Sequence, residues 1–103
     1  MDTKTDRELI ELAAKAVEHE GYWHDRFGGQ FIVTNKEGLL PFSFNPLVCD
    51  QDAFRLAVDL NLFGTPDLNH YLSVLSFIRG YDKYTLMRRA IVMAAAKIGE
   101  GME

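Results

Sequence analysis

The chain has 103 residues, of which 48% are hydrophobic and 25% charged, and its formal net charge is −4 at pH 7. This length predicts one domain, 1–103, with a single modest core, and the ordinary composition excludes wholesale disorder. A negative net charge argues against a nonspecific nucleic-acid binder, because such proteins neutralise phosphates with Lys and Arg. Residues 1–69 carry six Lys and Arg against twelve Asp and Glu, whereas residues 70–103 carry five against three, so the last third is weakly basic.

The single cysteine, Cys49, cannot form an internal disulfide, so the fold does not depend on oxidation. The first residues, MDTKTDRELI, are charged and lack the continuous apolar core of a secretory signal. No window approaches the ~20 apolar residues of a spanning helix. We therefore expect a cytoplasmic protein without a membrane partner.

A helix is predicted near the start of the chain. Thr5 and Glu8 have the spacing of a capping box, in which the hydroxyl caps the first turn and the carboxylate reaches back. Apolar residues then recur at helical spacing up to Val17, and Gly21 is the expected terminator.

Two strands are predicted over 30–34 and 41–44, because β-branched and aromatic residues dominate both and the NKEG segment between them is typical of a hairpin turn. Pro41 cannot donate a backbone hydrogen bond, which favours a strand start or an edge position. The aromatic segment before Gly28-Gly29 fits either a short extra strand or a loop.

The segment FNPLVCDQDAFRLAVDL, residues 44–60, predicts a strand end followed by a helix. Asn45-Pro46 ends the strand, since a residue before proline is held in extended geometry. Asp50 is expected to cap the helix, and Asp52 to lie in its first turn, where the helix dipole favours a negative charge. The expected buried stripe consists of Ala53, Phe54, Ala57, Val58 and Leu60.

Residues 70–79, HYLSVLSFIR, are predicted to form the third strand. Apolar residues fall on both of its faces, which is typical of an inner strand that is covered on each side. A helix is the alternative, and Ser73 and Ser76 interrupt its apolar pattern.

The last element is predicted to be a helix over 82–98, with Asp82 as its cap and Gly99 as its terminator. The residues expected to face the core are Tyr84, Met87, Ile91, Ala94, Ala95 and Ile98. Val92, Met93 and Ala96 exceed the apolar surface that a one-sided helix needs, so either the same chain or a second subunit covers them. We predict a homo-oligomer interface at these three residues.

These elements have the order α-β-β-α-β-α. Runs of this kind pack as a small sheet with helices against it. The predicted fold class is therefore α+β, as one small domain with three or four strands and helices packed against the sheet.

Two segments carry a more specific pattern. The pairing of an NPLxxDxDAxRLAV helix with a C-terminal RRAIVxAAAxI helix resembles small phage and prophage proteins that are grouped as the phage ABA sandwich domain. Many of these proteins also open with a helix similar to ELIELAAKA. The resemblance covers about residues 8–20, 44–60 and 84–99, and the middle of the chain departs from it. The shared motifs are packing motifs, so the resemblance implies a fold and a phage origin in a bacterial host cell, and it transfers no catalytic residue.

Residues that ligate metals or catalyse reactions show no productive spacing. His19 and His24 are five residues apart across a helix end, which is a poor chelate, and no CxxC or HExxH pair is present. Cys49 precedes a helix N-terminus, where a thiol pKa can fall, but a lone cysteine there is more often a small buried hydrophobe. We predict no metal, no cofactor and no catalytic residue; an enzyme built on Cys49 or His24 is the least favoured hypothesis.

The first candidate for binding is the segment GYWHDRF, which brings together Tyr22, Trp23, His24, Arg26 and Phe27. Trp, Tyr and Arg are the residues that dominate interface energetics. The alternative is that the aromatic side chains close one end of the core.

The second candidate is a modest basic region formed by Arg88 and Arg89 together with Lys83 and Arg79. Its alternative is a solvated face.

We predict a non-catalytic accessory protein that binds a host or phage macromolecule, with a protein partner favoured, and that modulates host defence or takeover. The alternative is a protein that binds or sequesters a small nucleotide-like anion through Arg88, Arg89 and aromatic stacking. A concave basic pocket favours the small ligand, and a flat apolar patch favours the macromolecule.

Overall fold

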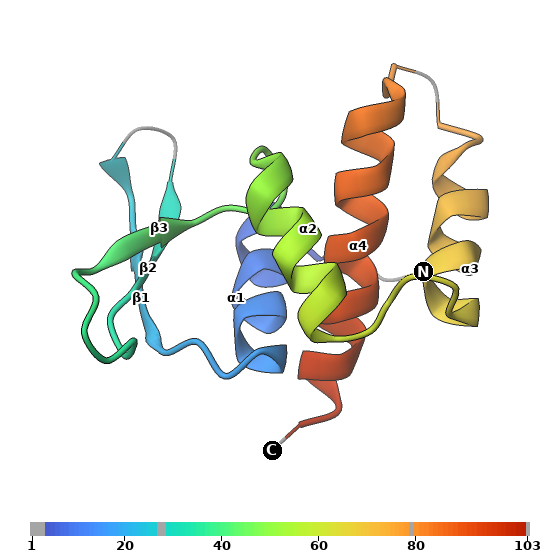
Figure 1. Cartoon of the computed structure of the whole chain (residues 1–103). Helices are drawn as coiled ribbons and strands as arrows, with labels where there is room; N and C mark the ends of the chain where they lie inside the picture. Colours follow the sequence, from blue (N-terminus) through green and yellow to red (C-terminus); the bar gives the residue numbers. More distant parts are fainter. Residues whose placement is uncertain (1–3, 27–28, 79, 103) are drawn as a thin grey trace.

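The computed structural model describes residues 4–26, 29–78 and 80–102, and within them the chain forms four helices and three strands (Figure 1). In chain order these are α1(Asp6–Ala16), β1(Gly21–His24), β2(Gln30–Val33), β3(Phe42–Phe44), α2(Asp50–Asp59), α3(Pro66–Leu75) and α4(Lys83–Glu100). The α+β class and the three-stranded sheet are confirmed. α1, the hairpin, α2 and α4 follow the predicted order, while β1 is an additional strand and α3 replaces a predicted one.

Helix α1 begins at the predicted capping box. The Thr5 hydroxyl accepts a hydrogen bond from the Glu8 backbone N–H at 3.2 Å, and the Glu8 carboxylate accepts one from the Thr5 N–H at 3.2 Å. The helix ends at Ala16, well before Gly21. Gly21 lies in β1, where a Cβ atom would be 1.7 Å from the carbonyl oxygen of Ile32, so its glycine serves the sheet and not the end of the helix.

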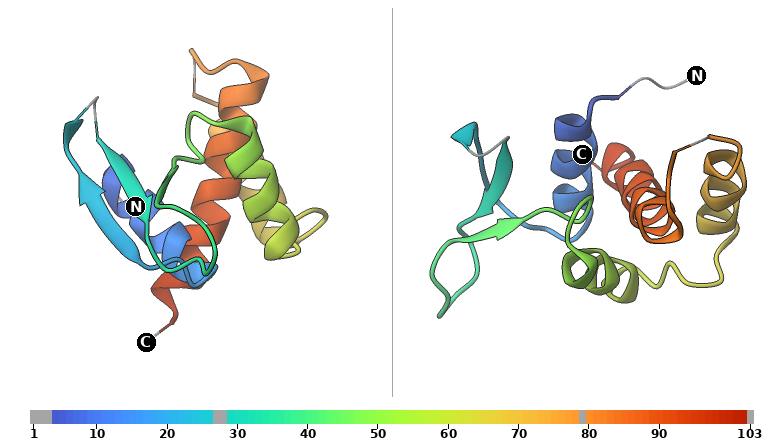
Figure 2. Two further views of the ribbon diagram at one scale, coloured as in Figure 1. Left: turned by 60° about the vertical axis from the view of Figure 1, so that its left-hand side comes forward. Right: turned by 90° about the horizontal axis from the view of Figure 1, so that it is seen from above.

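Helix α4 is the centre of the fold. It contacts α1, α2 and α3, and the view from above in Figure 2 shows it between α1 and α2 on one side and α3 on the other. The contact with α1 is close at Gly99, where a Cβ atom would be 2.0 Å from the carbonyl oxygen of Leu12. α4 continues past Gly99 to Glu100, so the prediction that Gly99 ends the helix is wrong.

The apolar run of α4 is covered by the same chain. Val92 and Ala96 are only 0% and 2% exposed, and Met93 is half-buried. Val92 and Ala96 therefore have no side-chain surface for a second copy, and the oligomer interface predicted at these two residues is wrong. Three other side chains expected in the core of this helix are exposed: Tyr84, Met87 and Ile98.

The sheet is antiparallel with the order β1-β2-β3. Its register pairs Trp23 with Phe31 and Phe31 with Phe44, so these side chains share the face that packs against the core. Tyr22 pairs with Ile32 on the opposite face. Within the described part of the chain no helix lies over that opposite face, because all four helices are on one side of the sheet (Figure 2).

Helix α3 occupies the segment that the apolar pattern assigned to a strand. Its cap is Thr65, whose hydroxyl accepts a hydrogen bond from the Leu68 N–H at 3.3 Å, and Pro66 follows at the first helical position, where its missing N–H is not needed. Leu68 and Leu75, seven residues apart, are both buried, which is a helical repeat. The strand predicted over 70–79 is therefore wrong, and its last residue, Arg79, lies outside the described residues.

Helix α2 begins differently from the prediction. Its N-cap residue is Cys49, which makes no side-chain cap bond. Asp50 is the first helical residue and pairs with Arg88, so its prediction as the cap is wrong. Asp52 lies in the first turn as expected, and its carboxylate accepts a hydrogen bond from the Asn45 backbone N–H at 2.9 Å.

The buried stripe of α2 is Ala53, Leu56 and Ala57. Phe54 and Val58, which were expected to be buried, are exposed.

Candidate functional site

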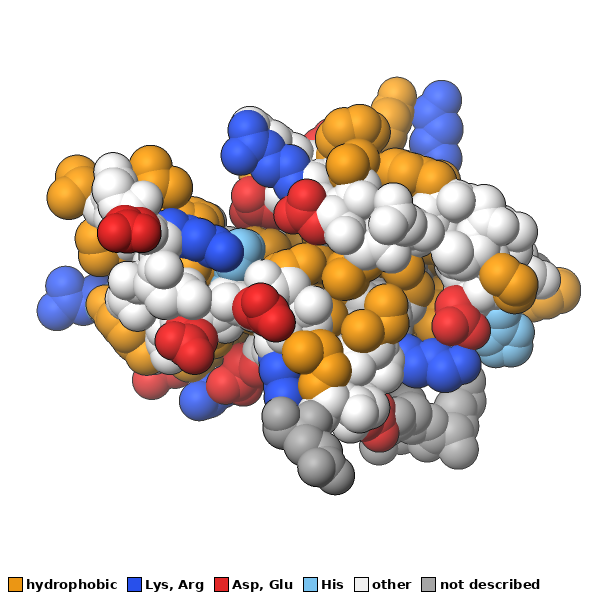
Figure 3. All heavy atoms as spheres, turned by 60° about the horizontal axis from the view of Figure 1, so that its bottom comes forward, with side chains coloured by type: hydrophobic (Ala, Val, Ile, Leu, Met, Phe, Trp, Pro, Cys, Tyr) orange, Lys and Arg blue, Asp and Glu red, His pale blue; other side chains and the backbone are white. Residues whose placement is uncertain are grey.

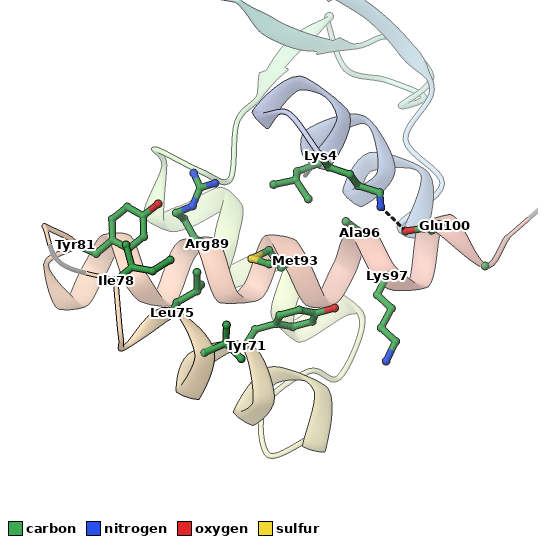
Figure 4. A pocket seen from close by; sticks show the side chains of 13 residues that line it. Lys4, Tyr71, Leu75, Ile78, Tyr81, Arg89, Met93, Ala96, Lys97 and Glu100 are labelled. Carbon is green, nitrogen blue, oxygen red and sulfur yellow. Dashed lines mark ion pairs between the residues drawn. The ribbon is translucent and has the colours of Figure 1, made fainter. Parts of the chain in front are cut away.

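A pocket of about 610 Å³ lies between α3, α4 and the start of α1 (Figure 4). Most of its lining is apolar or aromatic, and three cations and one acid complete it. The lining residues are Lys4, Leu9, Tyr71, Val74, Leu75, Ile78, Tyr81, Arg89, Met93, Ala96, Lys97, Glu100 and Gly101.

Long side chains of α4 line the pocket between the start of α1 and α3. Arg89, Met93 and Lys97 recur every four residues and so follow one face of the helix. Figure 4 shows Met93 near the middle of the pocket, with Tyr71 and Leu75 across from it on α3. Leu75 is buried, whereas Tyr71 and Met93 are half-buried, so an apolar surface remains open to a ligand.

Arg89 is a largely shielded charge, and one of its own donors lacks an acceptor. Its side chain is 21% exposed, and its guanidinium donates to the Asp6 carboxylate at 3.1 Å. The guanidinium carbon also lies 5.6 Å from the ring centroid of Tyr81, a cation–π contact. The Nε of Arg89 is buried and has no hydrogen-bond partner among the described residues. Since a buried donor without an acceptor costs free energy, this atom favours a site that is completed by a ligand.

The other charges of the pocket pair at its far end. Lys4 and Glu100 form an ion pair at 2.9 Å, which joins the N-terminal segment to the end of α4 (Figure 4). Lys97 donates to Asp67 of α3 at 3.0 Å, and this hydrogen bond raises the pKa of Lys97. Lys97 therefore remains cationic at neutral pH.

Arg88 and Arg89, which were predicted to form one basic region, make different contacts. Arg88 donates to the Leu47 carbonyl at 2.9 Å and to the Thr85 hydroxyl at 3.1 Å, and it pairs with Asp50. These contacts tie α4 to the start of α2. Arg88 does not line the pocket, so only Arg89 of the pair stands in the candidate site.

The predicted aromatic cluster is divided between the two faces of the sheet. Trp23 lies on the inner face, where Gly29 packs against its ring and the Arg7 guanidinium lies 5.3 Å from the ring centroid. Tyr22 is 52% exposed on the outer face, and its ring centroid is 6.4 Å from that of His24.

Two further members of the predicted cluster follow β1. Arg26 is exposed, and its backbone N–H donates to Nδ1 of His24 at 3.1 Å. Phe27 lies outside the described residues. The segment is thus part core closure, through Trp23, and part open surface, through Tyr22 and His24.

A smaller cleft of about 240 Å³ separates the sheet from α2. His19 lines it and makes edge-to-face contacts with Phe42 and Phe44, at centroid distances of 6.1 and 5.1 Å. Burial lowers the pKa of His19 below 6.5, and Lys36 acts in the same direction. Its Nδ1 is buried and has no hydrogen-bond partner in the described part of the chain.

Among residues 4–26, 29–78 and 80–102, no three His, Cys, Asp or Glu side chains are grouped so that they could hold a metal ion. No described helix is both long and apolar enough to span a bilayer. On the face in Figure 3, acidic and basic side chains are interspersed with hydrophobic ones and do not gather by sign.

Several residues of the pocket were not expected at a site. Tyr71 and Leu75 were assigned to a strand, and Met93 to a subunit interface. The available signal was the stripe of Arg89, Met93 and Lys97 on one predicted helix face, which mixes charge with a flexible apolar residue. That stripe predicts one wall of the pocket. The opposite wall could not be predicted in the same way, because it requires that residues 66–75 form a helix.

No family model matches the chain, and neither a curated protein nor a solved structure matches it.

Proposed function

We propose that the protein is a non-catalytic binding protein and that the pocket between α1, α3 and α4 takes a small ligand with an apolar body. The observation that carries this proposal is the pocket itself, about 610 Å³ in volume with Leu75, Met93 and Tyr71 on its walls. Ligand sites are typically concave, mostly apolar and roughly 300–1,000 Å³ in volume. The anion-binding alternative from the sequence is retained in part, since Arg89 lines this pocket and Arg88 does not.

A neutral solvatochromic dye tests the proposal. Nile red should bind the native protein at one saturable site, with the blue-shifted emission of an apolar environment. Val74→Trp should abolish this signal by filling the pocket from α3, whereas Val58→Trp, on the exposed face of α2, should leave it unchanged. If the dye fails to bind the native protein, or binds Val74→Trp equally well, the pocket is not a ligand site.

A second candidate function rests on the outer face of the sheet. We propose that this face binds a protein partner, because Tyr22 and His24 lie there and no described helix covers it. Tyr22 is exposed, and tyrosine is among the residues that dominate interface energetics. The resemblance to phage proteins supports a host or phage partner in the bacterial cytoplasm, and it is the sole support for a phage origin.

Affinity capture from host cells separates this candidate from the pocket. A partner retained by the native protein should be lost with the double variant Tyr22→Ala, His24→Ala. It should be kept with Tyr84→Ala, which removes an equally exposed aromatic side chain from α4. Loss of the partner with Val74→Trp instead would assign the interaction to the pocket.

A further inference from the structure

We infer that the ligand of this pocket is an amphipathic monoanion, with its acidic group at Arg89 and its apolar body along Met93 and Leu75. The inference rests on the proposed function and adds the chemical class of the ligand. It is carried by the unequal walls of the pocket, by the donors of Arg89 and by the acid at the far end.

The walls of the pocket differ in chemistry. Figure 4 shows Arg89 and Lys4 on the side of the pocket next to the start of α1, whereas Tyr71, Leu75 and Ile78 lie on the side of α3. A ligand between them meets Arg89 and Lys4 along one side and mostly hydrocarbon along the other, where the Lys97 cation is paired with Asp67 of α3. This is the surface that a molecule with one charged end and an apolar body complements.

Arg89 can hold an anion without losing its present partner. A guanidinium has five N–H donors in a planar fork, and Asp6 is its one hydrogen-bond acceptor in the described part of the chain. Asp6 is 66% exposed, so this carboxylate meets the guanidinium from the solvent side. A ligand carboxylate on the pocket side would take the remaining donors, and a small rotation of the guanidinium would then give the buried Nε an acceptor.

The far end of the pocket limits the ligand to one negative charge. Glu100 lines that end, and the lysine cations there are already paired, Lys4 with Glu100 and Lys97 with Asp67. A second anionic group would lie near the Glu100 carboxylate. Arg89 and Lys97 are eight residues apart on one helix, which corresponds to about 12 Å at 1.5 Å per residue, so a medium-chain acid matches the length.

The test compares ligands that share a tail and differ in the head group. Displacement of Nile red from the native protein should require about tenfold less decanoate than decanol, the effect of one charge-assisted hydrogen bond. Decyltrimethylammonium should bind more weakly than decanol. Because the whole protein has a net charge of −4, long-range electrostatics would favour the opposite order, so the preference reports on the pocket alone.

Variants of two neighbouring arginines locate the preference. Arg89→Gln should make decanoate and decanol equivalent, whereas Arg88→Gln should keep the preference, since Arg88 lies outside the pocket. Asp6→Asn keeps Arg89 and removes the negative charge that now offsets its guanidinium, so it should tighten decanoate binding several-fold. If Arg89→Gln does not fold, Asp6→Asn still tests whether Arg89 binds the acidic group of the ligand.

The outcomes separate the two proposals. If decanol and decanoate bind the native protein equally, or if Asp6→Asn leaves decanoate binding unchanged, the monoanion inference is overturned and the apolar site stands. If the dye itself does not bind the native protein, the proposed function fails. If the dye binds but neither ligand displaces it, the monoanion inference is overturned.

Discussion

The two sides of α4 pack in opposite ways. Toward α1 the side chains are small: Ala13 and Ala14 of α1 are buried, and Gly99 of α4 brings its backbone against the Leu12 carbonyl. Along the pocket between α3 and the start of α1 the side chains of α4 are long, and Arg89 and Met93 line this space of about 610 Å³.

This difference separates stability from binding within one helix. Side chains that allow backbones to touch leave no voids, and close packing of this kind stabilises a fold. Long, flexible or charged side chains prevent the same approach, so the second interface keeps space that a ligand can fill. The buried Nε of Arg89 belongs to the loose side, where a donor without an acceptor is compatible with binding.

A buried charge should destabilise the closely packed side of α4, which faces α1, more than any other substitution considered. Val92 is seven residues before Gly99 and so lies on the same face of α4. Val92→Glu should lower the free energy of unfolding by more than about 4 kcal/mol, because the carboxylate has no partner in that core. The control Met87→Glu, on the exposed face, should cost about 1 kcal/mol or less. Urea denaturation measures both free energies of unfolding. A Val92→Glu variant that folds stably as a monomer would contradict the buried position of Val92 and support its earlier prediction at a subunit interface.

A single methyl group tests how closely the tight side is packed. Gly99→Ala should destabilise the protein by about 1–3 kcal/mol, even though alanine is the better helix former, since its Cβ would meet the Leu12 backbone. Gly101→Ala is the matched control, because there the nearest atom is 3.6 Å from the new Cβ. Equal melting temperatures for the two variants would mean that the helices can separate without cost.

Truncation on the loose side should be cheaper. Met93→Ala should cost about 1 kcal/mol, since Met93 is half-buried beside space that already exists, whereas Ile91→Ala in the core should cost about 2–5 kcal/mol. Chemical denaturation gives the two values. Similar losses of unfolding free energy at both positions would show that Met93 stabilises the fold as much as the buried Ile91 does.

The contact between the sheet and α2 adds a pH dependence through His19, which lines the cleft there. The pKa of His19 is lowered in the folded protein, so the unfolded chain binds more protons between that folded pKa and 6.5. Stability from this group is complete above pH 6.5 and is lost as the pH falls below it. Asp52, Asp59 and Lys36 face the same cleft. His19→Gln should make the melting temperature depend less on pH between the folded pKa of His19 and 6.5. If the slope does not change, the pH dependence arises from the carboxylates.

Local signals predicted most of the elements. The capping box of Thr5 and Glu8 and the Asp82 cap depend on neighbours in sequence, and both are present. α3 was missed because a doubly apolar segment satisfies both a buried strand and a helix, and the deciding features, the Thr65 cap and Pro66, stand just before it.

The candidate site was less accessible to prediction. Arg89 was chosen as a basic residue beside Arg88, but adjacent residues on a helix point about 100° apart, so one faces α2 and the other the pocket. The aromatic segment was divided for the same reason, since alternate residues of a strand face opposite sides.

Local spacing and composition are enough to predict the α+β class, the hairpin, the first and last helices and the acidic net charge. Contacts between elements far apart in sequence decide that Val92 is buried, that long side chains of α4 line the space between α3 and the start of α1, and that a pocket remains there. The physical reason is that a cavity is set by the distance between two surfaces, and that distance depends on the size of side chains that meet from parts of the chain far apart in sequence.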